Sequence, residues 1–263
     1  MNNNSMERLE RYGDGIFETI FWIGEQHPLM PYHYERLKTG FEKLQLNPTF
    51  LPTYDHFVSL IKNSVNSDYP HRVRITAVRV AQGNYFVENE LVKFVINSVS
   101  YKSEFNSIFV QNLGVCPYYL TNGKSYLNGL KTCNCLPYIV AGNYAQKNLF
   151  DDCLMTNTDG RISEATSSNV FIVVDNQVYT PPVEEGLVLG TFRQYLIDNS
   201  ELFKFDIKFK EITTDFINKA DEIFLTNAVQ GIKIVRTFNG RKLQSDFTKK
   251  LRNKISSHFK HIV

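Results

Sequence analysis

The pattern of apolar and polar positions in the first hundred residues predicts three strands and two helices. Strand patterns are rich in aromatic and β-branched residues, and helix patterns repeat apolar residues three and four apart. The predicted order is strand, helix, helix, strand and strand, at 11–23, 31–44, 53–65, 73–81 and 85–95. The second helix begins at Thr53 or Asp55, and the last two strands meet at a turn containing Gly83. This order predicts a small α+β domain over residues 1–107, which ends in the polar linker YKSEFNS.

The remaining residues, 108–263, alternate between helix and strand patterns and are expected to form a larger second α/β domain. A helix with Pro137 in its first turn is predicted shortly after Lys131. The apolar positions that give this helix its pattern are Leu136, Ile139, Val140 and Tyr144. A strand at 170–174 follows, and a final helix at 245–258 is expected to pack through its apolar residues.

Composition and charge narrow the class of protein. The 263 residues are 43% hydrophobic and 21% charged, which is typical of a globular protein. A net charge of +2 gives no electrostatic footprint for nucleic acid or for a membrane surface. No apolar run approaches the roughly 18 residues of a transmembrane helix, and the polar start lacks a signal-peptide core. We therefore expect a cytoplasmic protein without nucleic-acid or membrane partners.

The cysteines and histidines indicate neither disulfides nor a metal site. The four cysteines are Cys116, Cys133, Cys135 and Cys153. Their spacing fits neither a disulfide framework nor a C-x-x-C motif, and the histidines make no metal-binding pattern with them. We expect all four to be reduced thiols and no metal to be bound.

The stretch from Leu127 to Val174 carries the candidate chemistry. Lys131 precedes the predicted helix, while Glu164 and Asn169 flank a loop of small residues that lets a ligand approach closely. A buried lysine can lose its proton and attack an aldehyde, and its freed amine can then move a proton. A carboxylate beside a pyridine nitrogen keeps that nitrogen protonated, so that the ring can accept electrons. Either residue alone would more often be a surface lysine or a hairpin residue, so the prediction depends on their joint pattern.

The segments LKTCNCLPYIVAGNYA and DGRISEATSSNVFIV together resemble the fold-type IV, class IV pyridoxal-phosphate enzymes. These include branched-chain and D-amino-acid aminotransferases and 4-amino-4-deoxychorismate lyase. The resemblance implies that Lys131 forms the Schiff base with pyridoxal 5'-phosphate and is the catalytic residue. It implies that Glu164 pairs with the pyridine nitrogen and that Asn169 lies at the cofactor. The resemblance extends over nearly the whole chain from Tyr12 onward.

The segment HYERL resembles the family's H-x-x-R-L motif, which implies that Arg36 holds the cofactor phosphate. Arginine suits this role because its guanidinium stays charged and presents a fork of donors. His33 of the same motif is expected to be structural, since nothing there supplies a nucleophile for it to activate.

Two loops of the second domain resemble the family's anion-binding segments. In the first, the backbone comes close at Gly190, and the N–H groups of Thr191 and Phe192 at a helix start can point at a phosphate. Arg193, one step further, is either structural or a ligand. In the second loop, Asn227 and Ala228 are expected to contact phosphate or a substrate carboxylate.

The segment GDGIFET resembles the motif that opens the family's first conserved strand, which implies that Tyr12 and Phe17 line the substrate pocket. Both also fit the description of ordinary core aromatics. Arg74 and Arg79 are an odd number of positions apart in one predicted strand, so at most one faces the pocket. Arg74 is the candidate. The family's arginine four residues beyond the pocket aromatic is replaced by Phe21, which removes a partner for an anionic substrate arm.

The resemblance implies a two-domain fold-type IV structure, similar to that of D-amino-acid aminotransferase, with the cofactor in the interdomain cleft, and a homodimer acting on a small amino substrate. The compact length favours 4-amino-4-deoxychorismate lyase, which releases pyruvate and 4-aminobenzoate. A branched-chain or D-amino-acid aminotransferase is the second reading, and a non-catalytic cofactor-binding homologue is the third.

Overall fold

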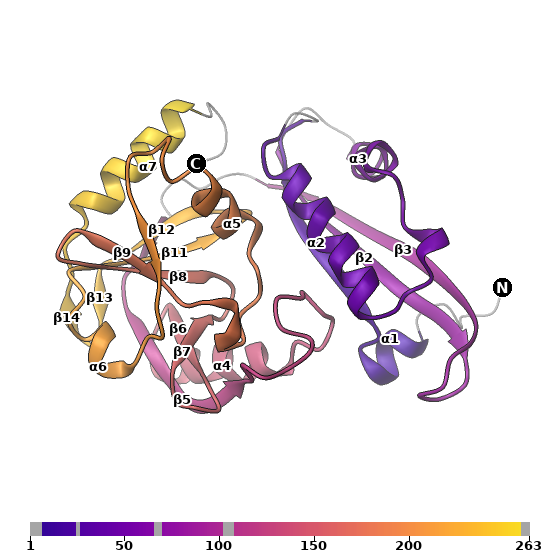
Figure 1. Cartoon of the computed structure of the whole chain (residues 1–263), viewed down its shortest axis with the longest axis horizontal. Coiled ribbons are helices and arrows are strands. Elements are labelled where there is room, and N and C mark those ends of the chain that lie inside the picture. Colours follow the sequence, from indigo (N-terminus) through magenta and orange to yellow (C-terminus); the bar gives the residue numbers. More distant parts are fainter. Residues whose placement is uncertain (1–6, 25–26, 66–69, 102–107, 259–263) are drawn as a thin grey trace. The chain divides into compact units, whose positions relative to one another are not determined.

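The computed structural model describes residues 7–24, 27–65, 70–101 and 108–258 (Figure 1). The chain divides into two compact units. The first contains residues 1–103 together with Leu130–Cys135, and the second contains residues 104–129 and 136–263. Residues 102–107 of the predicted linker lie outside the described residues.

The first unit has a three-stranded antiparallel sheet in the order β1-β2-β3. Its elements are α1 (Glu7–Tyr12), β1 (Gly15–Trp22), α2 (Met30–Lys43), η1 (Pro48–Phe50), α3 (Tyr54–Lys62), β2 (His71–Gln82) and β3 (Glu88–Ser100). The predicted order of strand, helix, helix, strand and strand is confirmed, and α1 is an additional element. Thr53 caps α3 by accepting the N–H of His56, which decides between the two predicted starts of this helix.

One face of this sheet is buried beneath α2 and α3, and Figure 1 shows α2 lying along it. Alternate strand residues such as Ile20, Val73 and Ile75 pack with Leu37 and Phe57 of the helices, and all five are at most 2% exposed. The intervening residues of these strands therefore point to the other face of the sheet, which α2 and α3 do not cover.

The second unit contains two sheets, a six-stranded sheet in the order β10-β9-β8-β11-β12-β4 and a five-stranded sheet in the order β14-β13-β5-β6-β7. The strands and helices are β4 (Phe109–Val110), β5 (Leu113–Thr121), α4 (Leu136–Lys147), β6 (Asp152–Asn157), β7 (Ile162–Ala165), β8 (Asn169–Val174), β9 (Gln177–Thr180), η3 (Val183–Glu185), α5 (Thr191–Asp198), β10 (Ile207–Phe209), α6 (Thr214–Ile217), β11 (Glu222–Asn227), β12 (Gly231–Val235), β13 (Thr237–Phe238), β14 (Arg241–Lys242) and α7 (Asp246–His258). The main core takes buried side chains from both sheets, including Leu154 and Ile162 of one and Ile172 and Leu225 of the other.

The predicted helix after Lys131 is present as α4, and its packed face is formed by small residues. Leu136, Ile139 and Val140 are 72%, 53% and 40% exposed, whereas the helix buries Ala141 and Ala145. These two alanines pack with Cys116 of β5 and with residues of β6. Because small side chains let a helix come close to a sheet, the packed face of α4 is the alanine face and the larger apolar residues point outward.

The final helix is confirmed as a packing element. Leu251 and Ile255 of α7 are 2% and 0% exposed. Glu222 accepts the N–H groups of Phe247 and Thr248 in the first turn of α7, which satisfies two donors that a helix start leaves open. Over the described ranges, none of the helices combines the length and hydrophobicity that crossing a membrane requires.

Candidate functional site

Lys131 is attached to the edge of the first unit's sheet. Its carbonyl accepts the N–H of Phe17 at 3.0 Å, and the N–H of Cys133 donates to the carbonyl of Gly15 at 2.9 Å. A bridge between Ile16 and Thr132 continues this pairing. These bonds explain why residues 130–135 belong to the first unit, although they immediately precede α4 in the sequence. The backbone of the candidate lysine is therefore held by a strand rather than left in a free loop.

The side chains of Lys131, Phe17 and Arg74 gather on the sheet face opposite α2. The Lys131 Nζ lies 4.7 Å and the Arg74 Cζ lies 3.5 Å from the centre of the Phe17 ring. Cys133 lies close enough to Arg74 to interact with it. Burial raises the pKa of the Cys133 thiol, and the guanidinium of Arg74 opposes that rise. This face thus presents two cations around one aromatic ring.

Arg79 is on the α2 side of the sheet, as the odd spacing from Arg74 predicts. It forms an ion pair with Asp14 at 3.1 Å and another with Glu90 at 2.9 Å, and it donates to the carbonyl of Leu44 just beyond α2. The expectation of opposite faces is confirmed, and Arg74 is the arginine that shares a face with Lys131.

Tyr12 ends α1, where its ring lies 5.5 Å from that of Tyr85.

Arg36 is oriented by a carboxylate that sequence reasoning missed. Glu18 of β1 is 2% exposed and accepts two hydrogen bonds from Arg36, from Nε at 2.8 Å and from Nη2 at 2.5 Å. His33 Nδ1 lies 2.6 Å from the same carboxylate. Glu18 stands at the E of the segment GDGIFET, a charged residue inside an otherwise apolar strand, and this was the available signal.

Electrostatics make this Glu18, Arg36 and His33 cluster a buried charged network. Burial works to raise the pKa of Glu18, but Arg36 and His33 together outweigh it and lower that pKa to about 2. Burial also lowers the pKa of His33 from 6.5, although Glu18 opposes this shift. His33 is thus placed in a structural role, while the role of Arg36 as a phosphate ligand stays a prediction.

In the second unit, Glu164 and Asn169 are both bound to the backbone of Val188. Glu164 is 3% exposed, and its Oε1 accepts the Tyr138 hydroxyl at 2.8 Å and the N–H of Val188 at 3.1 Å. Asn169 Nδ2 donates to the carbonyl of Val188 at 2.8 Å and lies 3.4 Å from Glu164 Oε2. All three of these donors are neutral groups. Tyr138 was not predicted, because no local pattern in the sequence indicates that this side chain of α4 reaches Glu164 of β7.

The loop of small residues between Glu164 and Asn169 is hydrogen-bonded to Asp152 of β6. Asp152 Oδ1 accepts both the N–H of Thr166 at 3.2 Å and its hydroxyl at 2.5 Å. The buried Lys233 balances this carboxylate, with Nζ 3.3 Å from Asp152 Oδ2. The loop is therefore rigid where the sequence required close approach of a ligand.

The helix α5 starts at Thr191 with Gly190 as its N-cap residue, which confirms the predicted helix start. A Cβ at Gly190 would lie 1.9 Å from Asn169 Oδ1, so only glycine fits there. Within the described part of the chain, the buried hydroxyls of Thr191 and Thr226 have no hydrogen-bond partner. Since buried polar groups are normally satisfied, these two hydroxyls are candidate donors to a ligand with acceptor oxygens.

Arg193 has the structural role of the two that the sequence allowed. It is 3% exposed, its Nη2 donates to the carbonyl of Pro181 at 2.9 Å, and its guanidinium lies 5.5 Å from the Phe209 ring. Burial lowers its pKa to about 10, although Glu164 and Glu184 oppose the shift. Arg193 thus adds a buried positive charge to the electrostatic surroundings of Glu164.

Asn227 uses its side chain within its own turn. Its Oδ1 accepts the N–H groups of Val229 and Gln230, and its Nδ2 donates to the Ser168 hydroxyl at 3.1 Å. Ala228 has no polar side chain, so it can offer a ligand only its backbone. Asn227 and Ala228 would therefore bind an anion through their backbone groups.

The cysteines are Cys116, Cys133, Cys135 and Cys153, and all are free thiols. In the ranges that the structure describes, no group of three or more histidine, cysteine, aspartate or glutamate side chains could hold a metal ion.

Comparisons with known proteins place these features in a family. Residues 15–238 match the model of the family described as amino-transferase class IV. The aminodeoxychorismate lyase of Vibrio harveyi is 24% identical over 247 residues, which cover 92% of this chain and 89% of the lyase. The D-alanine aminotransferase of Staphylococcus haemolyticus is 25% identical over 266 residues, covering 93% of this chain and 91% of that protein.

Solved structures show the same fold. The branched-chain aminotransferase of the archaeon Thermoproteus uzoniensis has a TM-score of 0.85 at 21% identity, covering 97% of this chain and 88% of its own. The 4-amino-4-deoxychorismate lyase of Pseudomonas aeruginosa has a TM-score of 0.83 at 20% identity, covering 96% and 93%. The predicted fold class is confirmed.

Proposed function

The chain belongs to the amino-transferase class IV family of pyridoxal-phosphate enzymes, and on that premise we propose that it is a 4-amino-4-deoxychorismate lyase. Its substrate would bind through an amine, and Lys131 would take the proton from the amine-bearing carbon. The carbon–oxygen bond to the enolpyruvyl group would then break. That group would leave with a proton as pyruvate, and the remaining ring would aromatise to 4-aminobenzoate.

The residues of both units fit pyridoxal phosphate. When bound, the cofactor accepts the electron pair that proton removal leaves on the amine-bearing carbon. The unsatisfied hydroxyl of Thr191 and the start of α5 suit the phosphate, and Glu164 suits the pyridine nitrogen. Lys131 would hold the cofactor covalently, and Arg36 would add a charged contact to the phosphate.

The observation that carries the proposal is the setting of Glu164. A carboxylate that is 3% exposed and bonded through Oε1 by a tyrosine hydroxyl and a backbone N–H is fixed in orientation. Such a group stabilises a positive charge on a ring nitrogen without needing to move during the reaction. Carbanion chemistry at an amine-bearing carbon depends on that charge, and both the lyase and the aminotransferase reactions pass through it.

The substrate side of the proposed site is the face carrying Phe17 and Arg74. Arg74 would pair with a substrate carboxylate, and its stacking on Phe17 fixes the plane of the guanidinium. Phe21 is 6% exposed and packs against His27 and Tyr101, so its position offers no charge to a second anionic arm. One carboxylate recognised by Arg74 is the arrangement we propose.

An aminotransferase for branched-chain or D-amino acids is the second candidate, because a D-alanine aminotransferase is as similar to this chain as a lyase is. The two reactions share Lys131 and Glu164 and differ in where the proton goes after its removal. We do not propose the non-catalytic alternative, since the family consists of enzymes.

One experiment separates the two candidates. Purified protein loaded with pyridoxal phosphate is incubated with 4-amino-4-deoxychorismate, and release of pyruvate and 4-aminobenzoate is measured. In parallel, it is incubated with a panel of L- and D-amino acids together with 2-oxoglutarate or pyruvate. We expect product only in the first reaction. Amino transfer without 4-aminobenzoate formation would establish the aminotransferase.

We also propose a homodimer. The outward face of α4 carries Leu136, Ile139 and Val140, and the exposed Tyr118 of β5 has its ring 5.9 Å from that of Tyr144 on α4. Apolar residues clustered in this way on one region of a surface are typical of an interface with another protein. A second copy of this chain is the proposed occupant.

A further inference from the structure

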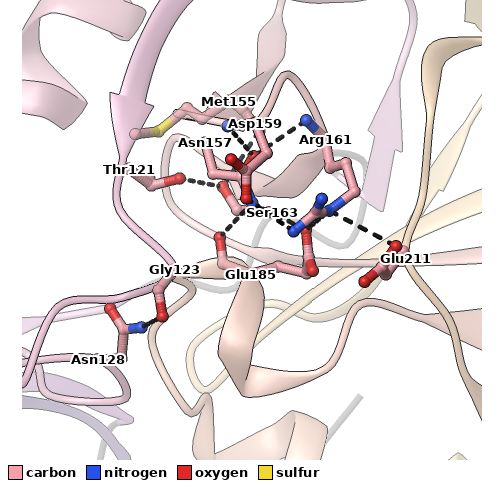
Figure 2. Close-up of polar contacts among 10 residues, drawn as sticks. All are labelled: Thr121, Gly123, Asn128, Met155, Asn157, Asp159, Arg161, Ser163, Glu185 and Glu211. Atoms are coloured by element: carbon pink, nitrogen blue, oxygen red, sulfur yellow. Dashed lines mark hydrogen bonds and ion pairs between the residues drawn. The ribbon is translucent and has the colours of Figure 1, made fainter.

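Residues 183–189 form a strap that is held at one end by an ion pair between the buried Glu185 and the partly exposed Arg161. The strap consists of η3, Gly186 and the extended residues 187–189. Glu185 is 1% exposed, and its Oε2 lies 2.6 Å from Arg161 Nε (Figure 2). Two other carboxylates, Asp159 and Glu211, also lie near Arg161, but they are 45% and 65% exposed at the side chain. Among these three carboxylates, the buried Glu185 would lose the most free energy if its ion pair with Arg161 were broken.

Asn157 joins this ion pair to the turn between β6 and β7. Its Nδ2 donates to Glu185 Oε2 at 2.8 Å, and its Oδ1 accepts the N–H groups of Asp159 and Arg161. Figure 2 shows these side chains converging on the Glu185 carboxylate. The end of the strap is therefore tied to the same hairpin whose second strand, β7, carries Glu164.

The middle of the strap has a fixed shape. Gly186 has a φ of +89°, and a Cβ there would lie 2.9 Å from backbone atoms of Asn122. Leu187, which is 1% exposed, accepts the N–H of Gly129 through its carbonyl at 3.1 Å. The middle of the strap is thus packed against Asn122 and bonded to Gly129.

The far end of the strap holds the candidate catalytic carboxylate. Val188 lies three residues after Glu185, and its N–H donates to Glu164 Oε1 at 3.1 Å. Its carbonyl accepts Asn169 Nδ2 at 2.8 Å. Leu189 then donates to the carbonyl of Gly129, which stands two positions before Lys131 in the sequence. The strap thus links the ion pair of Arg161 and Glu185 to the Val188 N–H, which donates to Glu164.

We propose that Arg161 and Glu185 are positioning residues for the Glu164 carboxylate, acting through the strap and the N–H of Val188. The inference rests on the proposed function, in which Glu164 holds the ring nitrogen of the cofactor. The ion pair fixes the position of the strap, and the Val188 N–H of the strap fixes the direction of the Glu164 carboxylate oxygens. Loss of the pair should leave Glu164 charged but less well aimed, which lowers kcat more than it raises KM.

The test combines a double-mutant cycle with hydrogen exchange. Glu185→Gln keeps the shape of the side chain and leaves Arg161 with its two exposed carboxylates. It is compared with Glu164→Gln, with the double variant and with Glu211→Gln, which removes another carboxylate near Arg161 without touching the strap. Exchange of the Val188 amide is measured in the protein without cofactor, and kcat and KM are measured in the loaded enzyme.

We expect Glu185→Gln to speed exchange at Val188 about tenfold and to lower kcat about tenfold with KM nearly unchanged, whereas Glu211→Gln matches wild type. In the Glu164→Gln background, Glu185→Gln should lower kcat no further, because the group it positions is already lost. Additive effects on kcat, or unchanged exchange at Val188, would overturn the positioning role.

Two further outcomes keep the proposals distinct. If Glu164→Gln lowers kcat but Glu185→Gln does not, only the positioning role fails. If Glu164→Gln itself has wild-type kcat, the proposed function and the positioning role both fail. Should Glu185→Gln not fold, Arg161→Lys serves instead. It keeps the charge but not the planar fork, so we expect an intermediate kcat, and a wild-type kcat with wild-type exchange would contradict the role.

Discussion

Glu18 and Arg36 form a two-point ion pair in the interior of the first unit, with Arg36 Nε 2.8 Å from Glu18 Oε1 and Nη2 2.5 Å from Oε2. The two residues stand 18 positions apart, one on β1 and the other on α2. Their pairing fixes the guanidinium before any ligand binds, and it makes the stability of this unit depend on pH.

The stability of the fold should fall when the pH is lowered. The pKa of Glu18 is lowered from 4.5 to about 2, so its stabilising contribution is complete above pH 4.5 and is lost as pH falls toward 2. His33 has a pKa below 6.5 in the folded state, so unfolded chains take up more protons as pH falls below 6.5, which also destabilises the fold. Urea unfolding midpoints measured from pH 7 to pH 3 should decrease continuously.

The variant Glu18→Gln isolates the carboxylate's share of that dependence. It should be less stable than wild type by about 3–5 kcal/mol at pH 7, because Arg36 loses its buried counter-charge. Below pH 4.5 the difference from wild type should narrow, because wild type then loses the same interaction. Parallel curves for the two proteins would contradict the assigned pKa shift.

Arg36 should contribute to cofactor retention, but the single variant Arg36→Ala cannot show it, because it leaves Glu18 buried without its cation. The double variant Glu18→Gln/Arg36→Gln removes both charges and should fold. Compared with Glu18→Gln alone, it should bind pyridoxal phosphate more weakly by about 1.5–3 kcal/mol, or roughly 10- to 150-fold, through loss of a charge-assisted phosphate contact. Equal dissociation constants would remove Arg36 from the phosphate site.

Lys131→Ala should abolish the visible absorbance of the covalently bound cofactor and essentially all turnover. Borohydride reduction of the loaded wild-type protein should add the cofactor's mass to the peptide that contains Lys131. Lys124→Ala is the matched control, since Lys124 is exposed on the loop that precedes Lys131. A modified peptide in the Lys131→Ala protein would identify a different lysine.

Glu164→Gln should preserve cofactor binding and lower turnover by orders of magnitude, each tenfold corresponding to about 1.4 kcal/mol. The amide oxygen can still accept from Tyr138 and Val188, so these two bonds should hold, while the charge and the longer bond from Asn169 are lost. A lyase is driven by aromatisation of its product, so its loss should be milder than that of transamination. Wild-type rates in both assays would show that this carboxylate does not touch the ring.

Ile139→Glu should convert a dimer into a monomer, because it places a charge within the exposed apolar face of α4. Light scattering after gel filtration gives the mass directly. Leu202→Glu is the control, since Leu202 is 52% exposed and lies outside α4. A wild-type protein that is monomeric with full cofactor occupancy would rule out the proposed dimer.

The sequence by itself determined the features that depend on local pattern. Strand and helix periodicity gave the order of elements in the first unit, and the glycine before Thr191 marked the start of α5. The spacing of Arg74 and Arg79 was enough to put them on opposite faces, because side chains alternate along a strand regardless of what surrounds it. Each of these follows from backbone geometry within a few residues.

Tertiary structure alone decided which distant groups meet. The pairing of Lys131 with β1, the ion pair of Glu18 with Arg36, and the bond from Tyr138 to Glu164 each join segments that are separated along the chain. The buried face of α4 was decided in the same way, because it is the sheet beneath the helix that selects small side chains over large apolar ones. Hydrophobic spacing shows that a helix has an apolar face, but only the surface it packs against determines whether that face is covered.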